Sequence, residues 1–227
     1  MTLARLDHVI YVADATAGDG DGLAATAARL GAAIGVEPVE GGVHTTFGTC
    51  NALLPLGGLQ YLEVVAVHDP QMAAGSPFGS AVAALSAGGG GWLGWAVRVD
   101  DLDPVAERLE RAMIPGGRLR PDGVELAWRQ VGTDVLTADP LLPFYLTWDV
   151  PPALHPAAGG PDDVHIVVLT LTGAPDDRRR LARWLDGELG GGSADPAPVR
   201  IEWTDSGDVA GLVGVAIRTG SGPVHLT

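Results

Sequence analysis

Apolar and polar positions follow a fixed order over the first 70 residues of the chain. An apolar run at residues 6–12 has the length of a buried strand, and apolar residues at helical spacing follow it. That helix face consists of Leu23, Ala27, Leu30 and Ile34. Three strand-like segments come next, at residues 43–47, 51–56 and 60–67. With Gly57-Gly58 as a hairpin turn between the last two, the pattern predicts a βαβββ unit.

The same order returns after residue 92. A strand is expected at residues 94–101, and apolar positions at helical spacing follow it, namely Val105, Leu109, Ala112 and Met113. Further strands are expected at residues 124–131 and 143–149, the first preceded by the turn Pro121-Asp122-Gly123. The Ala- and Gly-rich segment between the two units contains a helix pattern at residues 77–87.

A third, shorter copy follows residue 162. Residues 166–171 are rich in β-branched side chains and predict a strand. Pro175 opens a helix pattern, and closing strands are expected at residues 199–203, 212–218 and 224–226. We therefore expect an α+β fold in one compact domain. It would have a first module at 1–70, a second at 92–150 and a degenerate third, of βαβ type, at 162–227.

Charge and cysteine content narrow the function classes. The net charge is −14 and every basic residue is an arginine, so the surface repels nucleic acid and anionic membranes. No apolar stretch approaches the roughly 20 residues of a membrane span. Cys50 is the single cysteine, which excludes a disulfide within the chain and favours a cytoplasmic protein. A small-molecule ligand is the expected partner.

Four segments of the first unit resemble the glyoxalase-like branch of the vicinal-oxygen-chelate superfamily. They read Leu-Asp-His-Val-Ile-Tyr-Val at 6–12, Gly-Gly-Val-His-Thr at 41–45, Gly-Thr-Cys-Asn-Ala-Leu-Leu at 48–54 and Tyr-Leu-Glu-Val-Val at 61–65. The resemblance implies βαβββ modules that form a curled mixed sheet around a cleft. It also implies a divalent metal held by the first and last strands of each module.

Carried over by position, the resemblance implies His8 and Glu63 as metal ligands. Histidine with a carboxylate suits Zn, Fe, Mn, Ni or Mg, and open positions on such an ion would polarise vicinal oxygens of a substrate. In the second module, Trp95 and Thr147 stand at the matching positions and are poor ligands. We therefore expect an incomplete site with one divalent ion or none. Other histidines that could complete it are His44, His165 and His225.

Glu63 and His44 are also candidates for acid–base catalysis without a metal. An acid in the middle of an apolar strand is costly to bury without a partner, which singles out Glu63. Candidate substrate-binding residues are Asn51, Trp95, Trp128, Arg129, Trp148 and His155. Each has a plainer interpretation, since tryptophans serve core packing and polar groups serve strand ends or exposed faces.

Two functions remain open. The favoured one is a glyoxalase-like lyase or isomerase acting on vicinal oxygens of a small molecule. The alternative is a metal-free protein that binds and sequesters an antibiotic or metabolite. The third repeat either closes the sheet within the chain or contacts a second copy, so a homodimer is included among the expectations.

Overall fold

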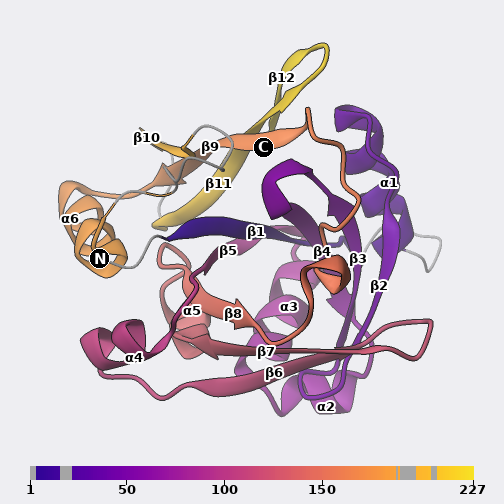
Figure 1. Cartoon of the computed structure of the whole chain (residues 1–227), viewed down its shortest axis with the longest axis horizontal. Coiled ribbons are helices and arrows are strands. Elements are labelled where there is room, and N and C mark those ends of the chain that lie inside the picture. The colour runs from indigo at the N-terminus through magenta and orange to yellow at the C-terminus, as the bar shows by residue number, and fades with distance from the viewer. Residues whose placement is uncertain (1–3, 16–21, 188, 190–197, 206–208) are drawn as a thin grey trace.

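The computed structural model describes residues 4–15, 22–187, 189, 198–205 and 209–227, which form two sheets flanked by helices (Figure 1). The larger sheet contains β1 (Arg5–Val12), β2 (Val39–His44), β3 (Thr49–Pro55), β4 (Tyr61–Val67), β5 (Gly91–Arg98), β6 (Ile114–Leu119), β7 (Glu125–Val131) and β8 (Phe144–Trp148). The smaller sheet contains β9 (His165–Thr172), β10 (Arg200–Thr204), β11 (Gly211–Thr219) and β12 (Gly222–Leu226).

The helices in the described part of the chain lie between these strands. They are α1 (Gly22–Ile34), α2 (Pro70–Ala74), α3 (Pro77–Ala87), α4 (Asp103–Leu109), α5 (Thr133–Ala138) and α6 (Pro175–Leu185), with short 3-10 turns η1 (Gly57–Leu59) and η2 (Pro152–Leu154). None of these helices is long and apolar enough to span a membrane.

The larger sheet closes into a barrel with the strand order β1-β4-β3-β2-β6-β7-β8-β5. Each of the first two units contributes four strands, and within each unit the first strand pairs in parallel with the last. The antiparallel pair β1–β5 joins the units on one side, and the pair Val43–Leu119 joins β2 to β6 on the other. This curled mixed sheet confirms the predicted fold class.

Strand alternation separates two apolar layers. Ile10, Val12 and Leu146 point to the concave side of the barrel and form one cluster with residues of α3 and α5. Val9, Trp95 and other outward residues form a second cluster on the convex side with α1, α4 and the smaller sheet. The concave side is therefore the one that contains the interior of the barrel.

The smaller sheet does not enlarge the barrel. Its strand order is β10-β9-β11-β12, with β9 parallel to β10 and antiparallel to β11. In the first unit, by contrast, the strand that precedes the helix pairs with the last strand. The third unit thus repeats the order of elements but not the arrangement of strands, and it packs against the convex side (Figure 1).

Several elements differ from the sequence predictions. The strand expected at residues 43–47 is β2 at Val39–His44, and the short helix α2 was not predicted. The helix expected through Met113 ends as α4 at Leu109, because Glu110 adopts a left-handed backbone with φ of 52°. The next residues form β6, which was not predicted because its sequence Ile-Pro-Gly-Gly-Arg-Leu contains residues that are rare in strands. The short helix α5 was also missed. The helix predicted at residues 77–87 is confirmed as α3.

Candidate functional site

A small cavity of about 50 Å³ opens on the concave side of the barrel and is lined by both units. Its polar side chains are His8, His44, Asn51, Glu63 and Arg118. Its aromatic lining consists of Phe47, Tyr61, Phe78, Trp128 and Trp148. The polar residues come from β1, β2, β3, β4 and β6, so the site depends on closure of the barrel.

Asp7 is completely buried beside this cavity. Its carboxylate accepts hydrogen bonds from His8 Nδ1 (2.7 Å), Trp148 Nε1 (3.1 Å), His155 Nε2 (3.2 Å) and Arg98 Nη1 (3.5 Å). Burial by itself raises the pKa of this carboxyl, but hydrogen bonds and charge from His155 and His8 outweigh burial and hold the pKa well below its usual range. Asp7 is therefore an anion at neutral pH.

The Asp7 anion orients His8. Because Nδ1–H of His8 donates to Asp7, the free Nε2 atom points to Glu63, with 3.7 Å between Nε2 and Oε2. The Tyr61 ring stacks on the imidazole at a centroid distance of 4.5 Å. Two consecutive side chains reach the same site because the β1–β5 pairing is irregular between Leu6 and His8, as in a β-bulge.

Glu63 lies between two histidines. Its Oε1 atom accepts a hydrogen bond from Asn51 Nδ2 at 2.5 Å and lies 3.5 Å from His44 Nε2. His44 Nδ1 lies 2.9 Å from the Thr49 hydroxyl. The carboxylate is thus approached by His8 at one oxygen and by His44 at the other, inside a nearly closed site.

Burial lowers the pKa of His44 to about 4; the negative charge of Glu63 partly offsets burial, and the nearby Arg118 and His8 side chains add to the lowering. His44 is therefore neutral at pH 7. Tyr61 keeps its hydroxyl proton, since burial, Asp7 and Glu63 raise its pKa well above the ordinary value. The side chains around Glu63 thus include a neutral imidazole and a neutral phenol.

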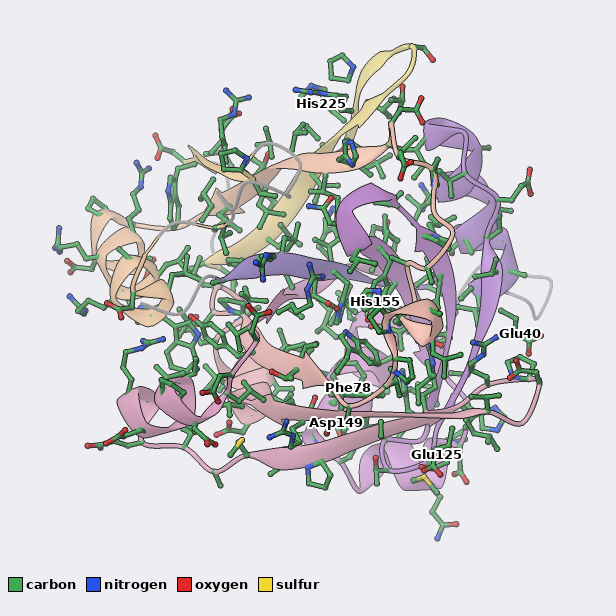
Figure 2. All side chains as sticks on the ribbon, in the orientation of Figure 1. Glu40, Phe78, Glu125, Asp149, His155 and His225 are labelled. Atoms are coloured by element: carbon green, nitrogen blue, oxygen red, sulfur yellow. The ribbon has the colours of Figure 1, made fainter. Side chains whose placement is uncertain are left out.

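Six residues predicted from the sequence meet in this cavity: His8, His44, Asn51, Glu63, Trp128 and Trp148. His155 lies behind it, where it contacts Asp7 and the Trp148 ring at 5.3 Å between centroids. His225, by contrast, lies exposed on the distant β12 hairpin (Figure 2). His165 belongs to β9 of the smaller sheet, so neither of these two histidines reaches the site.

Two predicted substrate-binding residues lie elsewhere. Trp95 faces the convex layer, where it is fully buried and donates a hydrogen bond to the Leu141 carbonyl oxygen. Arg129 is exposed on β7 and pairs with Asp149 at 3.1 Å, and the label of Asp149 marks that place in Figure 2. The strand register turns both side chains away from the cavity, so neither of them lines it.

The second module places other residues on the cavity side. Ala96 pairs with His8 across the β1–β5 ladder, and Leu146 lines the cavity from β8, as Glu63 does from β4. The predicted counterparts, Trp95 and Thr147, are each one residue away, and Thr147 donates to the Val99 carbonyl oxygen instead. Ala96 and Leu146 offer no metal ligand either.

The residues present do not fit a divalent metal. Among the described residues, no group of three or more His, Cys, Asp or Glu side chains has a metal-binding arrangement. His8 and His44 approach different oxygens of Glu63, and the Asn51 amide already donates to one of them. The Arg118 cation also lines this cavity. His8 and Glu63 as metal ligands stay a prediction from the family resemblance alone.

Sequence reasoning missed three polar residues of the site: Asp7, Tyr61 and Arg118. Simple alternation places Asp7 on the strand face opposite to His8, and a bulge breaks that alternation. Arg118 lies on β6, the strand that was not predicted. One feature of the sequence did indicate a role for Asp7: Asp7 and His8 are adjacent polar residues in an otherwise apolar strand.

Comparisons with known proteins agree with this architecture. A family model described as a glyoxalase-like domain matches residues 6–189. A hypothetical protein from Staphylococcus aureus shares 14% identity over 95% of this chain and 91% of that chain, with a TM-score of 0.65. The methylmalonyl-CoA epimerase from Mycobacterium tuberculosis shares 18% identity over 66% of this chain and 90% of its own, with a TM-score of 0.43. No protein of curated function matches the chain. At 14% identity the structure from Staphylococcus aureus supports the fold alone.

Proposed function

Because the chain belongs to the glyoxalase-like family of the vicinal-oxygen-chelate superfamily, we propose that it is a small-molecule enzyme of the isomerase or lyase type. It would act by acid–base catalysis through Glu63. The observation that carries this proposal is the position of Glu63 between His8 and His44 in a buried cavity, with His8 oriented by the Asp7 anion.

Glu63 is the proposed base. It would accept a proton from a carbon next to a carbonyl group, the step that isomerases and lyases of this kind share. The Asn51 amide fixes the position of one carboxylate oxygen, so the other faces His8. His8 Nε2 would then exchange the proton with Glu63, and the Asp7 anion would stabilise the imidazolium that forms.

His44 has a different role in this proposal. Its low pKa keeps it neutral at pH 7, so it can donate or accept a hydrogen bond but adds no charge to the site. Arg118 lines the same cavity and would stabilise negative charge that develops on the substrate oxygens, and such electrostatic stabilisation is a large part of catalysis of this type. No step in this scheme passes through a metal ion.

Deuterium incorporation tests the proposal. Protein in D₂O would be incubated with a panel of 2-oxo and 2-hydroxy carbonyl compounds, and exchange next to the carbonyl would be followed by proton NMR. We expect wild-type protein to accelerate exchange of at least one compound, and Glu63→Gln to lower that rate at least about 100-fold. Glu125→Gln, at an exposed position of β7, is the matched control and should leave the rate unchanged. Full activity of Glu63→Gln would contradict the role of Glu63.

A second function is supported by the aromatic lining. Trp128, Trp148 and Phe78 line one cavity, and such surfaces bind flat apolar ligands. In that case the protein would bind a small molecule without converting it. A ligand that raises the melting temperature and is recovered unchanged would favour this function, whereas a converted ligand favours the enzyme.

A further inference from the structure

Arg118 is a buried cation without a carboxylate partner. The residue is 4% exposed, and among the described residues no carboxylate oxygen lies within ion-pair distance of it; Glu63 favours its charge only at longer range. Its Nη1 donates to the Asn51 amide oxygen at 3.3 Å, and its Nε atom is buried with no hydrogen-bond partner. A buried charge in this state is costly, so the site is suited to an anion that is not part of the chain.

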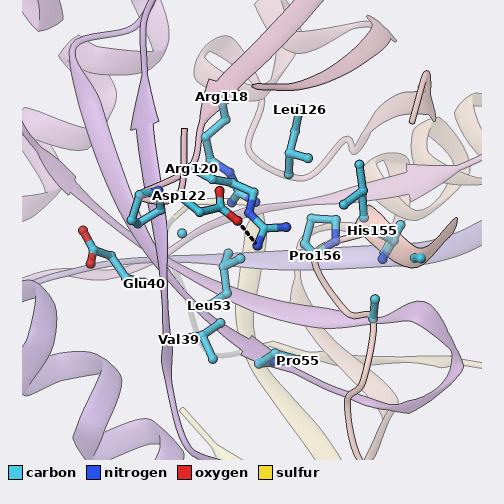
Figure 3. A pocket seen from close by; sticks show the side chains of 15 residues that line it. Val39, Glu40, Leu53, Pro55, Arg118, Arg120, Asp122, Leu126, His155 and Pro156 are labelled. Atoms are coloured by element: carbon cyan, nitrogen blue, oxygen red, sulfur yellow. Dashed lines mark ion pairs between the residues drawn. The ribbon is translucent and has the colours of Figure 1, made fainter. Parts of the chain in front are cut away.

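Arg118 also lies at the boundary of two cavities. It lines the small cavity that contains Glu63. It also lines a second cavity of about 420 Å³, whose other lining residues include Leu53, Pro55 and Leu126. We call this second cavity the outer chamber. Figure 3 shows Arg118 and Arg120 at one side of the outer chamber, with Leu53 and Pro55 opposite and Pro156 beside them.

The charges of the outer chamber single out Arg118. Arg120 already pairs with Asp122 at 2.8 Å, and Glu40 adds another carboxylate to the lining (Figure 3). The carboxylates of Asp122 and Glu40 disfavour a ligand with two negative charges. The single unpaired guanidinium of Arg118 suits a ligand with one negative charge. Guanidinium groups bind carboxylates through two parallel hydrogen bonds, and the Nε and an Nη atom of arginine can provide them.

We propose that Arg118 anchors the carboxylate of the substrate, with an apolar part of that molecule in the outer chamber. The substrate class is then a monocarboxylic acid with a short apolar tail, held by Leu53, Pro55 and Leu126. Its reactive carbon, within one or two bonds of the carboxylate, faces Glu63. The proposed binding of the carboxylate depends on Arg118 and not on catalysis. The reaction of the bound acid rests on the proposed function of Glu63.

Binding of two simple probes tests this proposal. Hexanoate has a carboxylate and a short apolar tail, and hexanamide has the same shape without the charge. Calorimetry with wild-type protein should give at least tenfold tighter binding for hexanoate than for hexanamide. Arg118→Gln should weaken hexanoate binding at least tenfold, and Arg129→Gln, which removes an exposed arginine outside both cavities, should leave it unchanged. Equal affinity for the two probes would overturn the proposal, as would tighter binding of hexyl phosphate.

A second readout needs no substitution at Arg118. The Nε–H nitrogen resonance of Arg118 in wild-type protein should shift on addition of hexanoate and stay in place with hexanamide. An unmoved resonance at saturating hexanoate would overturn the proposal even where Arg118→Gln fails to fold. Glu63→Gln separates the two proposals, because it should keep hexanoate binding while losing exchange. Binding that follows Arg118, with exchange independent of Glu63, would overturn the catalytic scheme and leave the anion site intact.

Discussion

Asp7 shows how one side chain can organise a site that it does not line. It is fully buried, and its carboxylate accepts hydrogen bonds from residues of β1, β5, β8 and the segment that contains His155. A buried carboxylate is stable as an anion only where such partners surround it. Asp7 therefore links the orientation of His8 to the correct packing of both units.

Asp7→Asn should destabilise the protein strongly. The substitution removes the negative charge that His8, His155 and Arg98 share, and breaking a buried charged network costs about 3–5 kcal/mol. Urea unfolding at pH 7 measures the loss. Asp100→Asn is the matched control, since Asp100 is an exposed partner of Arg5, and it should change the free energy of unfolding by less than about 0.5 kcal/mol.

His44 predicts a pH dependence of stability. Its pKa is about 4 in the folded protein, below the ordinary histidine value of 6.5, so the unfolded chain binds a proton at a higher pH than the folded one. Stability should therefore fall between pH 6.5 and pH 4, by on the order of 3 kcal/mol. The groups facing His44 are Glu63, Arg118 and His8, and of these the Glu63 charge opposes the effect.

Urea unfolding at pH 7 and pH 4.5 checks this dependence. His44→Gln should lose less stability between the two values than wild-type protein, because it lacks the buried imidazole. His68→Gln, at an exposed position, should keep the wild-type dependence. An identical loss in all three proteins would show that His44 does not resist protonation.

At the level of single residues, the sequence predicted that His8 and Glu63 share one site, and it did not indicate that Asp7 orients His8. His8 and Glu63 stood out because polar groups in apolar strands need partners, and they do face each other across the cavity. Trp95 and Thr147 were placed one residue out of register, because a bulge and a short ladder shift the alternation that sequence reasoning assumes.

Helix α3 is the element that brings an aromatic side chain into the cavity from outside the sheet. It begins after the N-cap Ser76, whose hydroxyl accepts a hydrogen bond from the Gly79 amide at 2.9 Å, and it presents Phe78 to the cavity. Gly79 allows α3 to approach α2 closely. A Cβ there would overlap the Phe47 carbonyl oxygen and lie 2.6 Å from Ala73 Cα.

Gly79→Ala should therefore destabilise the protein by about 1–3 kcal/mol, since backbone rather than a flexible side chain occupies the space. Gly88→Ala is the control at the other end of the same helix, where φ is −87° and the nearest atom to a Cβ is 3.4 Å away. It should be neutral within about 0.5 kcal/mol in thermal unfolding. Equal effects of the two substitutions would contradict the close packing of α3 on α2.

Elements with a regular spacing of apolar residues were predicted well, whereas strand β6, which joins the two units of the barrel, was not predicted. α1 and α3 have apolar positions at regular helical spacing and were found close to their true limits. β6 has Pro115, Gly116 and Gly117 in its centre and becomes a strand only because β7 pairs along its whole length. Since Arg118 lies on β6, this missed strand also concealed the anion site.

In the whole molecule, the barrel and the smaller sheet share one apolar layer. Val9 and Trp95 from the barrel belong to the same buried cluster as Ile166, Leu171 and Ile217 from the smaller sheet. The order of elements in the sequence predicted the third unit. It did not predict that this unit packs on the convex side of the barrel, because the order of elements does not determine which surface a unit covers. That position leaves the concave side and both cavities to the first two units and the segments that follow each of them.

In the proposed scheme, Glu63 acts without a metal ion. Deuterium exchange of the best compound of the panel, before and after dialysis of wild-type protein against EDTA, tests this. The exchange rate should stay within about twofold, and added Zn²⁺, Mn²⁺ or Ni²⁺ should not raise it. A rate that falls at least tenfold on dialysis and returns with one of these ions would contradict metal-free catalysis at Glu63.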